Sequence, residues 1–272
     1  MLGLIVALSN GCNEGQVETK LDTAVQQLFA PRKTPQQYMV LAVSSEDADV
    51  RRDAVARIST SNKYTQEWAI KGFVAIACLE SDPQTRCVAM RALARTGDPR
   101  AVETALKLLN HNDYPPQEVW PPVPLCRWDA AEALANLSAR GQVPEEYQTQ
   151  VAKTLLDHLH IDLDRHTRIA AARGLGYYPS EQTVKGLIEG LRDQDFAVVY
   201  QCEDALVRLT GCTHGADVQA WEEWLESNGD DPFAHAGEVP ESRRPPYRNQ
   251  WEKGVHDTRE LVRWLWPGSK EQ

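Results

Sequence analysis

The sequence predicts an all-α fold, a right-handed α-solenoid of about five helix pairs. A nine-residue pattern occurs five times in the 272 residues, as VRRDAVARI, TRCVAMRAL, CRWDAAEAL, TRIAAARGL and VVYQCEDAL. Successive copies lie 35, 41, 41 and 31 positions apart when counted from Arg51, Arg86, Arg127, Arg168 and Val199. That spacing is the length of one helix pair per repeat.

Each copy of the pattern has the apolar spacing of a helix that packs on one face. Three positions after the register residue comes a small side chain, in Ala54, Ala89, Ala130, Ala171 and Cys202. Seven positions after it comes an aliphatic one, in Ile58, Leu93, Leu134, Leu175 and Leu206. Spacings of three and four place both kinds on one helical face, where small residues let a neighbouring helix approach closely.

A second helix-forming segment precedes each copy, as a helix pair requires. The first copy follows either LDTAVQQLFA or PQQYMVLAV, and these two alternatives stay open. The later copies follow TQEWAIKGFVAIACLE, DPRAVETALKLLN, EEYQTQVAKTLLDHL and SEQTVKGLIEGL. Pro99 directly after Asp98 suits the start of a helix, because proline is favoured in the first turn and aspartate caps it.

Aspartate and arginine recur together at the start of the second helix. Asp47, Asp82 and Asp164 stand four residues before Arg51, Arg86 and Arg168. We expect each carboxylate to cap its helix and each arginine to stack against the equivalent turn of the next repeat, which makes an inter-repeat ladder. The alternative is a solvated pair within one turn that contributes little stability.

These strings resemble HEAT-repeat proteins, in particular the bacterial short-repeat type related to phycobilisome-lyase repeats. The resemblance is carried by GDPRAVETALKLL followed by strings such as TRIAAARGL, and it covers about residues 36–228. It implies an ARM-type superhelix whose second helices line the concave side. The string LTGCTHGADVQAWEEWL resembles the ending of such arrays, so we expect Trp221 and Trp224 to cap the last repeat, with a displayed binding patch as the alternative.

Candidate protein-binding residues come from two places. Trp120 lies in NHNDYPPQEVWPPVP, where prolines forbid a helix and predict a projecting loop, unless the loop packs on its own repeat. Trp128 and Tyr200 stand one position after the register residue, and Asp129 and Gln201 two positions after it, so all four are candidates for contact on the concave side.

Charge and motif argue against several functions. A formal charge of −10 and a pI near 5.2 are unfavourable for nucleic-acid binding. The histidines show none of the His-Glu pairs that a di-iron HEAT-type hydroxylase needs. DHLHIDLDRH, residues 157–166, is rich in metal-binding side chains, but His158 and His160 point to different helix faces. We therefore expect no metal, no cofactor and no nucleic-acid partner.

The two ends of the chain differ from the array. Residues 1–12, MLGLIVALSNGC, resemble a bacterial lipoprotein signal, with Cys12 as the lipidated residue and residues 13–35 as a tether and first helix. This places the protein at the cell envelope, facing the periplasm and touching the membrane only through the Cys12 anchor; the alternative is a cytoplasmic protein. Residues 229–250 read as a Pro-rich linker, and residues 251–272 as an amphipathic helix. We expect this helix to dock on its own array, with a partner protein or a membrane interface as the alternatives.

Together these features predict a protein that is not an enzyme, a HEAT-repeat scaffold that binds a protein or peptide partner at the bacterial envelope. Two alternatives stay open. One is an accessory lyase or chaperone for a tetrapyrrole-type cofactor, and the other is a purely structural envelope protein.

Overall fold

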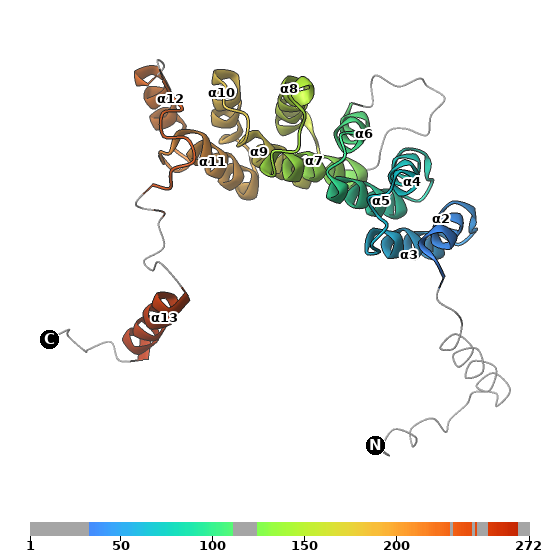
Figure 1. Cartoon of the computed structure of the whole chain (residues 1–272). Helices are drawn as coiled ribbons and strands as arrows, with labels where there is room; N and C mark the ends of the chain where they lie inside the picture. The colour runs from blue at the N-terminus through green and yellow to red at the C-terminus, as the bar shows by residue number, and fades with distance from the viewer. Residues whose placement is uncertain (1–32, 111–123, 229–230, 241–242, 244–249, 266–272) are drawn as a thin grey trace, which may run out of the picture.

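The computed structural model of the chain describes residues 33–110, 124–228, 231–240, 243 and 250–265. Within these residues it contains twelve α-helices and no strand, so the predicted all-α class is confirmed. Ten of the helices form five successive pairs (Figure 1). We call the first helix of each pair an A helix and the second a B helix.

The A helices are α2 (Pro35–Ser44), α4 (Glu67–Leu79), α6 (Arg100–Leu109), α8 (Glu145–Ile161) and α10 (Glu181–Gly190). The B helices, which carry the repeated pattern, are α3 (Ala48–Ser59), α5 (Pro83–Thr96), α7 (Pro124–Ala139), α9 (Arg165–Leu175) and α11 (Phe196–Thr210). Two further helices follow, α12 (Val218–Ser227) and α13 (Gln250–Leu265). The helix before the first copy of the pattern is therefore PQQYMVLAV, while LDTAVQQLFA lies outside the described residues.

The ends of the B helices follow from local sequence. An aspartate caps four of them and accepts a hydrogen bond from a backbone N–H of the first turn, in Asp47, Asp82, Asp164 and Asp195. Helices α5 and α11 end at Gly97 and Gly211, whose positive φ angles of 71° and 72° favour glycine because it has no Cβ.

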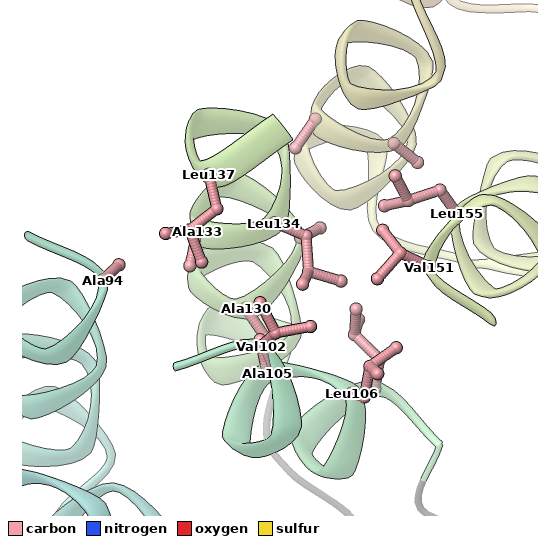
Figure 2. Packing of buried hydrophobic residues seen from close by; sticks show 14 of the residues in the cluster. Ala94, Val102, Ala105, Leu106, Ala130, Ala133, Leu134, Leu137, Val151 and Leu155 are labelled. Atoms are coloured by element: carbon pink, nitrogen blue, oxygen red, sulfur yellow. The ribbon is translucent and has the colours of Figure 1, made fainter. Parts of the chain in front are cut away.

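The core consists of the positions that recur in the pattern. The small side chains three positions after the register residue and the aliphatic ones seven positions after it are all fully buried. Figure 2 shows this packing in the third and fourth repeats, where Ala130 and Leu134 of α7 lie among Val102 of α6 and Val151 and Leu155 of α8. Each repeat thus completes its core with side chains from its neighbours.

The B helices form one continuous row, whereas A helices such as α6, α8 and α10 stand apart from one another (Figure 1). Neighbouring B helices pack on each other along their lengths, and neighbouring A helices touch less. Because the spacing is tighter on the B side, the solenoid curves toward it. The row of B helices is therefore the inner, concave side.

Helix α12 closes the array with a tryptophan cluster. Trp221 is fully buried, and its indole N–H donates to the carbonyl of Gly215 at 2.9 Å. The rings of His214 and Trp224 pack against it edge-on, with centroids 4.8 Å and 5.7 Å away. The core of the last repeat is covered in this way.

Candidate functional site

Arginine–carboxylate pairs connect successive repeats along the edge where A helices turn into B helices. In each pair the guanidinium donates to both oxygens of a carboxylate in the next repeat, at 2.7–3.1 Å: Arg51 with Glu80, Arg127 with Asp162, and Arg168 with Asp193. Two parallel hydrogen bonds per pair fix the geometry as well as the charge contact.

The carboxylates of these pairs also hold the turn in which they lie. Glu80 accepts the backbone N–H of the cap residue Asp82 at 2.9 Å, and Asp162 accepts that of Asp164 at the same distance. Asp193 accepts the N–H of Asp195 at 2.7 Å. One acidic side chain therefore joins its own turn to the arginine of the preceding repeat.

This arrangement differs in detail from the ladder drawn from sequence. The cap aspartates hold their own helices, and the inter-repeat partner is a second acid two positions earlier, in the strings ESD, DLD and DQD. Arg86 has its Nε bonded to the carbonyl of Ala77 at 3.0 Å. Sequence reasoning missed Glu80 and Asp193 and considered Asp162 only as a possible metal ligand, although the alternation of acids was a usable signal.

Asp162 is the most enclosed of these acids. The ring of His158 lies between two repeats, with Nδ1 2.9 Å from Asp162 Oδ2 and Nε2 3.2 Å from the carbonyl oxygen of Leu109. Burial opposes ionisation of Asp162, but hydrogen bonds from His158 and Arg127 outweigh it and hold the pKa of Asp162 well below its ordinary value. His158 and Asp162 of the segment DHLHIDLDRH thus make an inter-repeat contact. Among the described residues, no three or more His, Cys, Asp or Glu side chains are placed to hold a metal ion.

A groove of about 350 Å³ lies between the B helices α5 and α7, on the inner side of the solenoid. Arg91 and Arg95 of α5 form one wall, and Asp129, Asn136 and Arg140 form the other. Its remaining lining is small, from Ala94, Ala133 and Ala139, with Glu132 at the side. The groove therefore combines a flat apolar floor with three guanidinium groups.

The arginines of the groove are held in place by neighbouring groups. The guanidinium of Arg95 lies 5.5 Å from the ring centroid of Tyr64, as in a cation–π contact. Arg140 donates to the carbonyl of Ala94 at 2.9 Å, across from α7 to α5. Arg91 is largely exposed, and its Nε forms an ion pair with Asp129 Oδ2 at 3.2 Å.

Asp129 is the unusual member of the groove. Its side chain is only 7% exposed, and its Oδ2 accepts no hydrogen bond from the residues that the structure describes, apart from the ion pair with Arg91. Burial raises the pKa of Asp129 above its ordinary value. A buried acceptor gains from each hydrogen bond it accepts, so a ligand that brings an N–H donor to Oδ2 adds an interaction to the ion pair with Arg91.

Two thiols lie close to Asp129, and one of them, Cys87, is hydrogen-bonded to its carboxylate. The Sγ atoms of Cys87 in α5 and Cys126 in α7 are 3.9 Å apart, and both side chains are buried. The hydrogen bond with Cys126 and then burial raise the pKa of Cys87, while the same hydrogen bond lowers that of Cys126. They pack the two B helices together under the groove.

The aromatic candidates from the sequence occupy different environments. Trp128 is half-buried, and its ring centroid lies 5.0 Å from that of His166 in the next repeat. Tyr200 is 57% exposed on α11. Trp120 and Cys12 lie outside the described residues. A role of these residues in partner binding stays a prediction.

Residues 85–111 match the family described as PBS lyase HEAT-like repeat. The matched segment spans most of α5 and all of α6, and it includes Arg91 and Arg95 of the groove. The chain also matches the structure of the complex of CpcE and CpcF of phycocyanin lyase from Nostoc sp. PCC7120. The identity is 19%, over 73% of this chain and 71% of that chain, and the TM-score is 0.49. No curated protein matches.

The resemblance to short HEAT repeats of the PBS-lyase type is thereby confirmed. The prediction that the chain is not an enzyme is wrong, because the family that its repeat matches is named for a lyase. The placement as an envelope lipoprotein anchored at Cys12 is also wrong, because the matched repeat family is named for a lyase. Across the described ranges, no helix has the length and apolar character needed to span a bilayer.

Proposed function

We propose that this chain is a lyase-type HEAT-repeat protein that binds a tetrapyrrole in the groove between α5 and α7 and presents it to a protein partner. The observation that carries the proposal is the match of residues 85–111 to the PBS lyase HEAT-like repeat. That segment supplies one wall of the groove, with Arg91 and Arg95.

The groups around the groove suit the chemistry of a tetrapyrrole. Such a molecule carries propionate carboxylates, a set of pyrrole N–H donors and a wide apolar surface. Guanidinium groups bind carboxylates in a bidentate fashion, so Arg91, Arg95 and Arg140 are the expected partners of the propionates. Asp129 Oδ2 is the expected acceptor for pyrrole N–H groups, since it is buried at the groove beside the largely exposed Arg91.

The size and shape of the groove support the same proposal. Its volume of about 350 Å³ falls at the lower end of ligand pockets, which range over roughly 300–1,000 Å³. A tetrapyrrole would therefore be held at one end and leave the rest of its length on the inner surface. There a partner protein could take it up, with Trp128, Tyr200 and Trp120 as candidate contacts.

Titration with biliverdin, a linear tetrapyrrole, tests the proposal. Biliverdin is added to the purified chain, and the change in its visible absorption gives the Kd. We expect saturable binding, and at least roughly tenfold weaker binding in the Arg91→Ala/Arg95→Ala variant, because a charge-assisted hydrogen bond contributes about 1.5–3 kcal/mol. Asp129→Asn tests the acceptor, since an amide replaces the carboxylate at nearly the same volume.

The matched control is Arg192→Ala. Arg192 is an exposed arginine after α10 that pairs with Glu189 and Glu222, far from the groove, and its loss should leave the Kd unchanged. If biliverdin does not bind, or binds wild type and groove variants equally, the proposal is refuted.

A further inference from the structure

The row of B helices ends at α11 with two large side chains uncovered. Phe196 is 79% exposed and Tyr200, one turn later on the same face, is 57% exposed. In a solenoid this face of a B helix normally packs against the B helix of the next repeat. Helix α11 has no next B helix among the described residues.

The equivalent position in earlier repeats shows what is missing. In three earlier repeats, the residue one position after the register residue contacts the next B helix. Arg52 of α3 donates a hydrogen bond to Gln84 of α5 at 2.6 Å, and Cys87 Sγ of α5 lies 3.9 Å from Cys126 Sγ of α7. The ring centroids of Trp128 in α7 and His166 in α9 are 5.0 Å apart. Tyr200 holds this same position in α11. Its exposure therefore marks a contact site of the array that lacks its usual helix.

The chain returns to α11 after the end of α12, but it covers only part of the helix. The backbone N–H of Gly237 donates to the carbonyl of Arg208 at 2.8 Å, and Arg243 pairs with Glu203 and Asp204. A groove of about 510 Å³ remains between this returning segment and α11, with Tyr200 in its lining. The first two turns of α11, with Phe196, stay open beside it.

Helix α13 has the length and the apolar face expected of a helix that packs on α11. It has 16 residues and α11 has 15, so the two helices are nearly equal in length. At about 100° per residue, Trp251, Val255 and Leu261 fall within an arc of roughly 120°. Trp251 is 77% exposed and Leu261 is also exposed, and Figure 1 shows α13 standing apart from the array.

The connection between the array and α13 is short. Arg243 is fixed on α11, and only residues 244–249 separate it from the start of α13. Six residues span at most about 22 Å, which keeps α13 within reach of the whole of α11. A short tether of this kind also gives a high effective concentration, so docking within the chain is favoured over capture of a separate helix.

We propose that α13 docks on the open face of α11 over Phe196 and Tyr200, in the position of a sixth B helix. This inference concerns the end of the array and does not rest on the proposed function.

Hydroxyl-radical footprinting with mass spectrometry tests the docking, because it reports the solvent exposure of individual aromatic side chains. It is applied to the full chain and to a Trp251→Asp/Val255→Asp variant. We expect oxidation of Phe196 and Tyr200 to be severalfold faster in the variant. Lys253→Ala is the matched control, because Lys253 lies on the opposite face of α13 and its loss should leave both rates unchanged.

A reciprocal variant keeps the test independent of the folding of α13. Phe196→Asp/Tyr200→Asp should speed the oxidation of Trp251 severalfold, with far-UV circular dichroism showing that the array is intact. Equal oxidation rates in wild type and variants overturn the proposal. Protection of Phe196 and Tyr200 that grows with protein concentration also overturns it, since the occupant is then α13 of a second copy.

Discussion

Asp162→Ala is predicted to be the most destabilising single change in the ladder. Asp162 has a side chain only 2% exposed, and it accepts hydrogen bonds from Arg127, His158 and the backbone N–H of Asp164. Its removal leaves the guanidinium of Arg127 enclosed between two repeats without its carboxylate. Breaking a buried pair in this way costs about 3–5 kcal/mol.

The measurement is urea denaturation followed by far-UV circular dichroism, which gives the midpoint and the m-value of each variant. A solenoid is held by contacts between neighbouring repeats, so a weakened interface can also separate the unfolding of its two halves and lower the apparent m-value. The matched control is Glu181→Ala. Glu181 is 67% exposed and pairs with Lys185 within α10, so its loss should cost at most about 1 kcal/mol.

A double variant separates loss of the charge pair from loss of packing. Arg127→Met combined with Asp162→Asn removes both charges and keeps an amide oxygen of nearly the same volume as acceptor for the backbone N–H of Asp164, so it should be markedly more stable than Asp162→Ala. The reasoning is refuted if Asp162→Ala and Glu181→Ala have the same midpoint, because the ladder would then contribute no more than an exposed ion pair.

Three further predictions follow from burial and charge. Ala130→Leu should lower the free energy of unfolding by about 1–3 kcal/mol, because the larger side chain overpacks the buried contact. Ala139→Leu, at an exposed position of the same helix, should leave it nearly unchanged. Equal urea midpoints for the two variants would show that the predicted packing register is wrong. The pKa values of Asp162 and Glu80 are lowered in the folded state. These two carboxylates therefore stabilise the fold above about pH 4, the pKa range of unfolded acids, and this stabilisation is lost as the pH falls through their pKa values in the folded state. Urea midpoints measured from neutral to acid pH should fall less steeply in Asp162→Asn than in wild type, and parallel curves would contradict this. Burial raises the pKa of Asp129 in the folded state. The folded state is therefore destabilised as the pH rises above the pKa that Asp129 has in the unfolded chain. The urea midpoint of Asp129→Asn, compared with that of wild type, should be higher at pH 7 than at pH 4.

The helix pairs could be predicted from sequence because their determinants are local. The small and aliphatic positions of the pattern recur at helical spacing, and all of them are buried in the structure. Caps such as Asp82 and Asp164 follow from the residues next to them. These features need no knowledge of how one repeat lies against another.

The contacts between repeats could be predicted only in part. Asp129 was a candidate from its place after the register residue, but Arg91 and Arg95 come from the preceding repeat and meet it only when α5 packs on α7. Glu80 was missed for the same reason, since its partner Arg51 lies in the preceding repeat. A lyase-type role was only an alternative to the scaffold in the sequence-based prediction, because no recognised catalytic motif pointed to it.

Hydrogen–deuterium exchange with and without biliverdin tests the central claim most directly, because it locates a bound tetrapyrrole on the chain. We predict that biliverdin slows exchange in peptides that cover Arg91–Arg95 of α5 and residues 129–140 at α7, and that the effect disappears in the Arg91→Ala/Arg95→Ala variant. Biliverdin that slows exchange only elsewhere, or in no peptide at a saturating concentration, would contradict a tetrapyrrole site on the inner row of B helices.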